Sequence, residues 1–382
     1  MANNNDNKVL NVPHLRFPEF SGEWKMCTIG ELITKVGSGV TPRGGEAVYK
    51  TEGHPFVRSQ NVGLGNLLLD DIAFIDEETH LRQKNTELQF NDVLLNITGA
   101  SIGRSALVDK QIVGGNVNQH VCIIRTKENL VPSFICSFLL SNYGQRQIDS
   151  FQAGGNRQGL NFEQIKSIKI TIPSKDEQIK IAKLLRAIDE RIATQNKIID
   201  KLQSLIKGIA QNVARNNKPN IRLSECLECS SSTLQESDVC KNGTYPVYGA
   251  NGIVGYLDNY NTEKEAVYII KDGSGVGTVS YVTGKCSATG TLNTLQAKEG
   301  YSLQYLYYML KVFNFEPYKT GMAIPHIYFK DYGKAKIFCP SYTEQLKYAR
   351  LLSAIDNKLS AEQSILTDLS LQKQYLLRQM FI

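Results

Sequence analysis

The sequence predicts an α+β protein in which two mixed α/β domains are separated by two long antiparallel coiled-coil helices. Three observations lead to this prediction. The chain contains an internal repeat, each repeat ends in a long heptad pattern, and each heptad pattern follows short apolar segments separated by glycine-rich loops. With 382 residues, the chain has room for two or three domains.

The internal repeat is clearest where the segment beginning Pro173-Ser174 recurs 167 residues later at Pro340-Ser341. Between residues 173 and 189, eleven of 17 positions are identical at this offset. Further upstream the offset becomes 174, where residues 93–103 resemble residues 267–277. A seven-residue difference is typical of a loop that has changed length. We therefore predict a tandem duplication with domains over residues 1–175 and 217–342 and spacer helices over residues 176–216 and 343–382.

Each repeated segment has the pattern of a helix start. Ser174 as N-cap and Glu177 at the third helical position match a capping box, and Ser341 with Glu344 repeats it. Apolar residues then recur at alternating steps of four and three, which predicts a coiled coil; a pair of ordinary core helices is the alternative. The residues expected to form the seam or to dock other subunits are Leu184, Leu185, Ile188, Ile192, Gln195, Ile199, Leu202, Leu352, Ile355, Leu359, Glu362 and Leu366.

The order of the segments predicts the direction of the helices. The first helix delivers the chain to the second domain, and because domain termini usually lie close together, the second helix should run back antiparallel to the first. The first seam covers residues 181–213, which is about 48 Å of helix. Gln195 and Glu362 fall near the same midpoint, where they could pair and set the register.

Two features depart from a simple two-helix seam. Leu184, Ile198 and Leu205 flank the first seam and widen its apolar face, either as a docking strip for partner helices or as packing against the domains. In the second helix, Glu362 and Lys373 interrupt the apolar seam. We therefore expect weaker packing of the second helix toward its C-terminal end.

Both predicted domains combine short strands with one amphipathic helix. Glycine-rich polar loops separate the strands, as is typical of mixed α/β domains. In the first domain the expected strands are residues 56–57, 92–97, 121–124 and 168–172, with a helix at 132–141. In the second they are residues 267–270, 278–282 and 336–339, with a helix at 303–311.

Composition excludes several classes of protein. A net charge of +6 permits an acidic partner such as nucleic acid without requiring one. No apolar run approaches the ~18 residues of a membrane span, and the polar start of the chain lacks the apolar region of a secretion signal. We expect no membrane association and a cytoplasmic location with reduced thiols. Cys226 and Cys229 form the lone CxxC, which leaves zinc or buried thiols open; we predict no metal site.

The usual catalytic motifs do not match. The phosphate-loop pattern fails around Gly284-Lys285, because Val279 and Cys286 replace the glycine and hydroxyl residue that it needs. The glycines of residues 273–277 lack dinucleotide-binding spacing. No HExxH or GxSxG is present, nor the Asn/Asp-Pro-Pro-aromatic sequence of amino-methyltransferases. We predict a chain that is not an enzyme and binds no cofactor.

The loops instead carry Asn, Gln, Ser, Thr and Arg side chains between glycines. Asn and Gln can form paired hydrogen bonds with adenine, Arg can do so with guanine, and glycines let backbone amides approach phosphates. Ordinary turns use the same residues, but their recurrence in both domains favours DNA binding. The candidates are Arg43, Arg58, Ser59, Gln60, Asn61, Thr98, Ser101, Arg104, Asn116, Asn118, Gln119, Arg157, Gln158, Tyr248, Asn251, Lys271, Asp272, Ser274, Thr289, Thr291, Asn293 and His326.

Two divergent domains, each followed by a Pro-Ser-x-x-Glu-Gln helix, resemble the specificity subunit of type I restriction–modification systems. The segments Leu15–Phe20 and Tyr245–Gly252 are also similar to that family. The resemblance implies two target-recognition domains that each read half of a bipartite asymmetric sequence in double-stranded DNA. It implies spacer helices that recruit two methyltransferase subunits, with two restriction and translocase subunits joining them. S-adenosylmethionine and ATP would then be bound by those partners.

Two other functions remain open at this point. One is a recognition module or modulator derived from a fused restriction–methylation enzyme. The other is an interaction scaffold that does not bind DNA.

Overall fold

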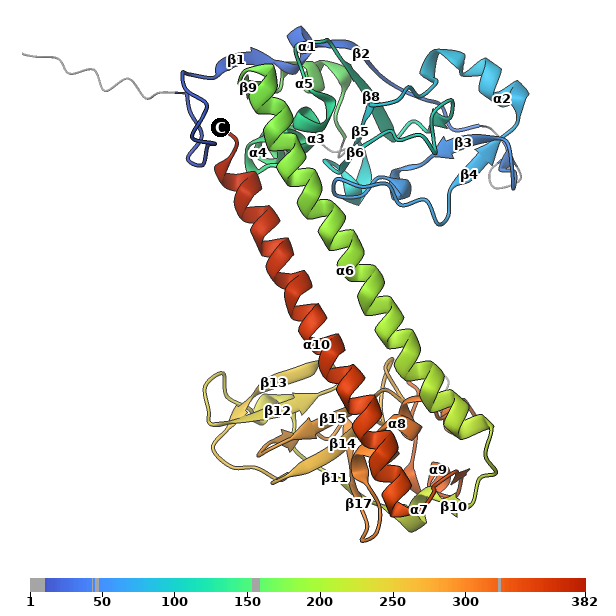
Figure 1. Cartoon of the computed structure of the whole chain (residues 1–382). Coiled ribbons are helices and arrows are strands. Elements are labelled where there is room, and N and C mark those ends of the chain that lie inside the picture. The colour runs from blue at the N-terminus through green and yellow to red at the C-terminus, as the bar shows by residue number, and fades with distance from the viewer. Residues whose placement is uncertain (1–10, 43, 45–47, 153–158, 322–323) are drawn as a thin grey trace, which may run out of the picture. The chain divides into compact units, whose positions relative to one another are not determined.

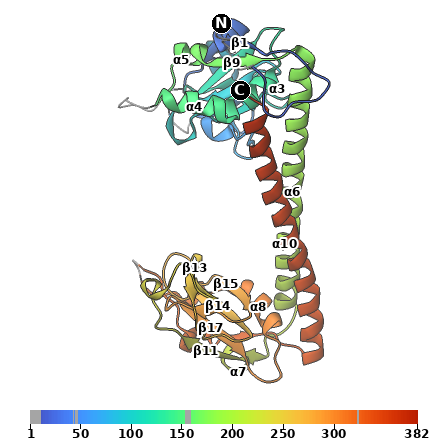
Figure 2. The same cartoon turned by 90° about the vertical axis from the view of Figure 1, so that its left-hand side faces the viewer.

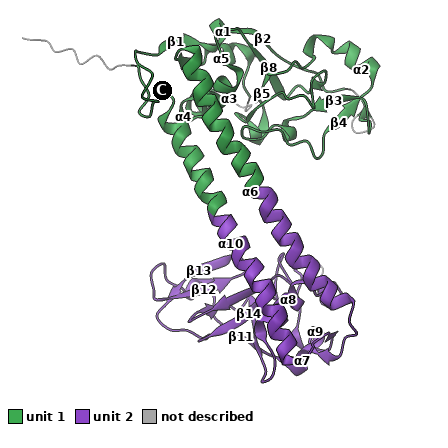
Figure 3. Cartoon of the chain, in the orientation of Figure 1, with its two compact units in different colours: residues 1–195, 365–382 green, residues 196–364 purple. Residues whose placement is uncertain are grey.

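Figure 1 shows the computed structural model, which describes residues 11–42, 44, 48–152, 159–321 and 324–382. The chain forms two compact units: unit 1 comprises residues 1–195 and 365–382, and unit 2 comprises residues 196–364 (Figure 3). Two long helices, α6 (Lys175–Arg215) and α10 (Tyr342–Gln379), each contribute one part to each unit. The predicted class of mixed α/β units with two long helices is confirmed.

In its described residues, unit 1 contains three small sheets. A four-stranded antiparallel sheet has the order β2-β8-β5-β6, a three-stranded sheet has the order β4-β3-β7, and β1 pairs with β9. The strands are β1 (Lys25–Thr28), β2 (Ile33–Ser38), β3 (His54–Val57), β4 (Ala73–Ile75), β5 (Val93–Asn96), β6 (Ser105–Leu107), β7 (Asn116–Val117), β8 (Val121–Thr126) and β9 (Lys169–Ile172). The shorter helices are α1 (Ile29–Leu32), α2 (Glu77–Arg82), α3 (Pro132–Leu140), α4 (Asn142–Ser150) and α5 (Phe162–Ser167).

Unit 2 repeats this plan. Its sheets have the orders β11-β17-β14-β15, β13-β12-β16 and β10-β18. The strands are β10 (Ile221–Arg222), β11 (Leu227–Ser231), β12 (Tyr245–Gly249), β13 (Gly252–Leu257), β14 (Glu265–Ile270), β15 (Val279–Thr283), β16 (Ser287–Ala288), β17 (Leu292–Ala297) and β18 (Lys336–Ile337). The shorter helices are α7 (Leu223–Cys226), α8 (Leu303–Lys311) and α9 (Phe329–Tyr332).

The repeat is visible in strand register as well as in sequence. In unit 1, Leu94 of β5 is opposite Ile123 of β8, and in unit 2 Tyr268 of β14 is opposite Thr294 of β17. In each three-stranded sheet the central strand pairs antiparallel with one neighbour and parallel with the other. The predicted tandem duplication therefore extends through the topology of both units.

Within unit 1, α6 and α10 run antiparallel. Asp189 of α6 pairs with Lys373 of α10, while Phe381, just beyond α10, belongs to the same buried cluster as Ile181 near the start of α6. The two helices lie beside each other in both views of this unit (Figures 1 and 2). The predicted direction is therefore correct for this part of the chain.

The end of α10 is deeply buried, contrary to the weak packing that we expected from the interrupted seam. Leu376, Met380 and Phe381 are all under one tenth exposed. The Phe381 ring lies 5.2 Å from the Phe134 ring of α3 between ring centroids. The expectation was wrong because these residues pack into the core of unit 1, where apolar burial contributes about 25 cal/mol per Å².

The glutamine of each repeated Pro-Ser-x-x-Glu-Gln motif locks the start of its helix onto the rest of its unit. Gln178 accepts a hydrogen bond from the Val131 amide (2.8 Å) and donates to the carbonyls of Asn129 and Pro173 (both 3.1 Å). In unit 2, Gln345 accepts from the Ser302 amide and donates to the Pro340 carbonyl (both 2.9 Å). In both units one buried amide side chain therefore ties the start of a long helix to the backbone just before α3 or α8.

Replacing Gln178 with leucine is expected to lower the free energy of unfolding by about 1–3 kcal/mol, because the Val131 amide is left buried without an acceptor. Urea unfolding of the full chain measures this loss. Gln203 is exposed on the same helix, so Gln203→Leu serves as the control and should change stability by less than about 0.5 kcal/mol. Equal effects of the two substitutions would show that the hydrogen bonds of Gln178 contribute nothing.

Candidate nucleic-acid interface

In unit 1, polar side chains gather where β5 ends and β8 begins. These antiparallel strands are neighbours, with Asn96 opposite Val121, so the residues just beyond them meet. Thr98 Oγ1 and His120 Nδ1 hydrogen-bond at 2.5 Å, and Gln119 Nε2 lies 3.4 Å from His120 Nε2. The result is a polar cluster at one end of the four-stranded sheet, with Gln119 exposed.

A second segment joins this cluster through the backbone. Thr98 forms an isolated bridge with Gly159. The candidates Arg157 and Gln158 come just before Gly159 in sequence, but they lie outside the described residues, as does Arg43. Asn118, in contrast, is buried, and its side-chain oxygen accepts from the His120 amide at 3.0 Å, which holds the turn in place.

Three of the candidates at residues 58–61 contact Asp71: Arg58, Gln60 and Asn61. Arg58 donates to the Asp71 carbonyl at 2.7 Å, with its guanidinium 3.5 Å from the carboxylate, and Gln60 also donates to that carboxylate. Asn61 is fully buried and donates both to Asp71 Oδ1 (2.8 Å) and to the Leu68 carbonyl (2.9 Å). Arg58 and Gln60 are thus held at the surface, while Asn61 shapes the loop from within.

A neighbouring loop presents Ser101 and Arg104. Buried Asn96 at the end of β5 donates to the Ser59 carbonyl (2.8 Å) and to Ser101 Oγ (3.0 Å), which joins this loop to residues 58–61. Arg104 is exposed. Asn116 lies apart from this surface, because its buried side chain bonds His80 Nδ1 at 2.7 Å and the Gln83 carbonyl at 2.9 Å.

Unit 2 has a polar cluster at the same end of its four-stranded sheet. Asp272, just after β14, accepts from His326 Nδ1 at 2.7 Å and lies 3.6 Å from the Lys271 ammonium. Asp272 and His326 also form an isolated backbone bridge. At the offsets of the sequence repeat, Thr98 corresponds to Asp272 and Gly159 to His326, so the two bridges are equivalent.

The remaining candidates of unit 2 divide between surface and interior. Thr291 and Tyr248 are half-buried, and the Thr291 carbonyl accepts from the Lys271 amide of the cluster. Thr289 links the two: its amide donates to the Tyr248 carbonyl and its hydroxyl lies 2.8 Å from that of Thr291. Asn293 is buried and bonds Ser231 and Tyr332. Asn251 and Ser274 are exposed on turns.

Sequence reasoning missed three residues that organise these surfaces. Asp71 and Asn96 hold loops of unit 1 together, yet neither stands out in the sequence, because their partners come from distant segments. Asp189 did carry a signal, since it recurs as Asp356 in the repeat. In unit 1 Asp189 pairs with Lys373 at 2.5 Å, and in unit 2 Asp356 accepts from the Tyr308 hydroxyl at 3.3 Å.

The residues expected to form the seam are buried or half-buried. Leu185, Ile188, Gln195, Ile199, Leu352, Leu359 and Glu362 are buried, and Ile192, Leu202, Ile355 and Leu366 are half-buried. Of the three flanking residues, Leu184 packs against the core of unit 1, whereas Ile198 and Leu205 are more than one third exposed. Packing against a domain therefore explains Leu184, and it does not explain the other two.

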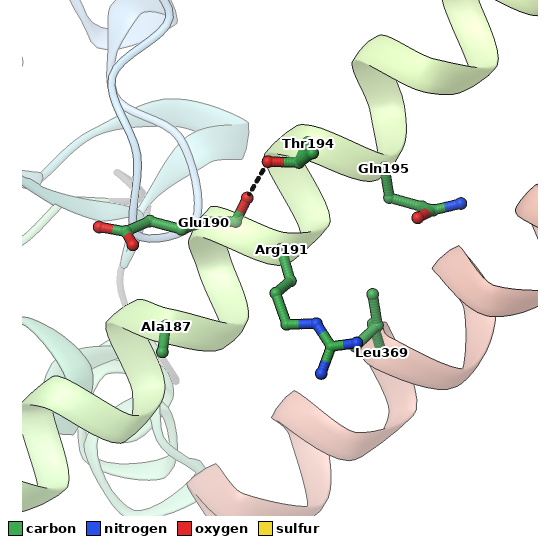
Figure 4. Close-up of a pocket in the computed structure, with 6 residues that line it drawn as sticks. All are labelled: Ala187, Glu190, Arg191, Thr194, Gln195 and Leu369. Carbon is green, nitrogen blue, oxygen red and sulfur yellow. Dashed lines mark hydrogen bonds between the residues drawn. The ribbon is translucent and has the colours of Figure 1, made fainter.

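Within unit 1, α6 and α10 border a shallow polar hollow (Figure 4). It is lined by Ala187, Glu190, Arg191, Thr194, Gln195 and Leu369. Arg191 extends from α6 toward Leu369 of α10, and Thr194 donates its hydroxyl to the Glu190 carbonyl at 2.8 Å. Charged and polar groups therefore lie beside the apolar seam at this surface.

Across the described part of the chain, no group of three or more His, Cys, Asp or Glu residues is arranged to hold a metal ion. Burial raises the pKa of Cys226 to about 12 and that of Cys229 to about 11, which favours thiols over the thiolates that bind zinc. No described helix is long and apolar enough to cross a membrane.

Two copies of one α/β unit, with polar loops at the same end of each four-stranded sheet, define a duplicated recognition protein. The family model "Type I restriction modification DNA specificity domain" matches residues 21–204 and again 219–370. The chain therefore belongs to the family of type I restriction–modification DNA specificity subunits. The specificity subunits of this family are non-catalytic.

Individual relatives agree with this family. A putative type I specificity subunit from Mycoplasma genitalium is 25% identical over 320 residues, covering 76% of this chain and 81% of the relative. The EcoKI specificity subunit of Escherichia coli K12 is 22% identical over 202 residues, covering 50% of this chain and 41% of that subunit. The crystal structure of a type I S subunit from M. genitalium has the same fold, with a TM-score of 0.67, 19% identity and coverage of 97% and 99%.

Proposed function

We propose that this specificity subunit reads a bipartite asymmetric sequence in double-stranded DNA, with each unit recognising one half-site. The observation that carries the proposal is the recurrence of one loop arrangement with different side chains. Thr98 with Gly159 in unit 1 and Asp272 with His326 in unit 2 occupy equivalent positions. Two domains that share a fold but carry different side chains in the same loops are suited to recognising two different DNA sequences.

The surface candidates are the proposed DNA contacts, and the buried ones shape the loops. In unit 1 the proposed contacts include Arg58, Gln60, Arg104 and Gln119, which offer donors for guanine, adenine and phosphate. In unit 2 they are Tyr248, Asn251, Lys271, Asp272, Ser274, Thr291 and His326. The buried candidates hold neighbouring loop residues in position and do not contact DNA themselves: Asn61, Asn116, Asn118, Thr289 and Asn293.

We further propose that α6 and α10 set the spacing of the half-sites and dock the other subunits. The exposed apolar residues Ile198 and Leu205 and the hollow around Arg191 support a docking role. The assembly would contain two methyltransferase subunits and two restriction and translocase subunits. Those partners would bind S-adenosylmethionine and ATP, and this chain would bind neither.

The test is a genome-wide methylation map of a strain with and without this chain. The expected result is a split motif that is methylated when the chain is present and unmodified when it is deleted. An unchanged map would contradict the proposal. In parallel, the affinity of the assembly for a duplex should fall steeply with salt, because phosphate contacts release counterions; failure to bind any duplex with methyltransferase subunits present would favour a scaffold.

A further inference from the structure

We infer that Lys373, near the end of the second repeat, is a positioning residue for the half-site read by unit 1. This inference rests on the proposed function. Lys373 was expected only to interrupt the seam of the second helix. In the structure its ammonium pairs with Asp189 of α6 at 2.5 Å and donates to the Leu64 carbonyl at 2.9 Å. One side chain of α10 thus joins α6 to a loop of the first recognition unit.

This junction is partly shielded from water. The side chain of Lys373 is 14% exposed and that of Asp189 is 30% exposed. Burial raises the pKa of Asp189 by disfavouring its charge, and the nearby Lys373 ammonium only partly offsets this effect. A partly buried pair that also bonds a backbone carbonyl has a defined geometry, unlike an exposed pair of flexible side chains.

The loop is shaped to fit this junction. Gly65 has a φ of +99°, a left-handed conformation that favours glycine. A Cβ at this position would lie 3.2 Å from both Asp189 Oδ2 and Lys373 Nζ, closer than most side chains allow. The backbone conformation of Gly65, its lack of a side chain and the neighbouring ion pair therefore all permit close contact between residues 62–67 and the two helices.

From the junction, hydrogen bonds lead directly to the proposed reading loops. The Gly65 amide donates to the Ser105 carbonyl at 2.9 Å, next to Arg104. On the other side, the Leu68 amide donates to the Asn61 carbonyl at 2.9 Å, which continues into the network of Arg58 and Asp71. Lys373 consequently anchors both loops to α6 and α10, although it follows the whole second domain in sequence.

The equivalent aspartate of unit 2 has a different partner. Asp356 accepts from the Tyr308 hydroxyl of α8, and the residue that corresponds to Lys373 in the first helix is Ile206. At this position the two recognition units are thus joined to the long helices by unlike contacts. A change at Lys373 should therefore affect one half-site and leave the other unchanged.

The experiment uses the full chain assembled with its methyltransferase subunits, with methylation mapped base by base in a strain that lacks the native copy. Arg104→Ala identifies the half-site that unit 1 reads. Lys373→Met is expected to raise methylation at sites with one changed base in that half-site about tenfold relative to the correct site, since a mismatch costs ~1–3 kcal/mol when the loops are held firmly. The other half-site should keep its discrimination.

Three further variants separate positioning from folding. The double variant Lys373→Met with Asp189→Asn leaves no unpaired charge at residue 189, but it still lacks the hydrogen bond to the Leu64 carbonyl. It should therefore lower sequence discrimination at the same half-site. Lys373→Arg should restore discrimination. Lys347→Met removes a charge from the same helix, where Lys347 is exposed to solvent, and it should leave both half-sites unchanged.

If Lys373→Met lowers sequence discrimination at both half-sites, or at neither, the inference is overturned. Failure of Lys373→Arg to restore discrimination while the melting temperature of the complex stays that of the unmodified chain would overturn it as well. If the unmodified chain itself gives no sequence-specific methylation, the proposed function fails, which is a distinct result.

Discussion

Replacing Arg16 with methionine is expected to lower the free energy of unfolding by about 3–5 kcal/mol, the range for a buried ion pair that loses one partner. Arg16 binds Glu177 through two hydrogen bonds of 2.7 and 2.8 Å. It also donates to the carbonyls of Gly22 and Ser21. The Glu177 side chain is 1% exposed, so the substitution would leave a carboxylate in the interior without a counter-charge.

Chemical denaturation of the full chain measures this effect, and a double variant identifies its cause. Adding Glu177→Gln to Arg16→Met should recover a large part of the loss, because a buried amide costs less than a buried charge. Arg186→Met is the matched control on α6: Arg186 and Glu190 are 76% and 64% exposed, so their pair should contribute less than about 1 kcal/mol. Losses of similar size for Arg16→Met and Arg186→Met would refute the assigned role of Arg16.

The second large effect concerns target spacing. Under the proposed function, deleting residues 194–200 from α6 together with residues 361–367 from α10 should shorten the gap between half-sites by about three base pairs. Seven helical residues span about 10.5 Å, and base pairs stack about 3.4 Å apart. A heptad is nearly two full turns, so the remaining seam residues keep their face to within about 20°. Gln195 and Glu362 lie in the deleted segments and are removed together.

Methylation mapping of this variant measures both the gap and the sequence of each half-site. The two half-sites should be unchanged, since the deleted residues belong to the helices and not to the reading loops. A deletion of residues 194–200 alone is the control, and it should abolish methylation because the two helices no longer match in length. An unchanged gap in the doubly deleted variant would show that the helices do not set the spacing.

Local sequence predicted the long helices well because their signals lie within a few residues of one another. Ser174 was expected as the N-cap, and α6 begins at Lys175 with the Glu177 amide 3.4 Å from Ser174 Oγ. The carboxylate of Glu177 did not complete the capping box. It binds Arg16, which is 161 residues away in the chain, and no local pattern reveals such a partner.

In the reading loops, too, the local sequence predicted some features and the fold decided others. Their polar composition was evident, and the loops after β5 and β14 do present polar clusters at corresponding positions. Composition could not separate Arg104, which is exposed, from Asn61, which is fully buried. That distinction depends on Asp71 and Leu68, whose positions relative to Asn61 are set by the fold.

By itself, the sequence determined the duplication, the two long helices and the polar character of the loops, because periodicity and repetition are properties of order along the chain. Only the tertiary structure decided which polar residues face inward, and it assigned Lys373 and Arg16 to partners in distant segments. Burial converts a side chain from a solvated group into one that requires a specific partner. The partner can be distant in the sequence and is brought close only by folding, so a local sequence pattern cannot predict it.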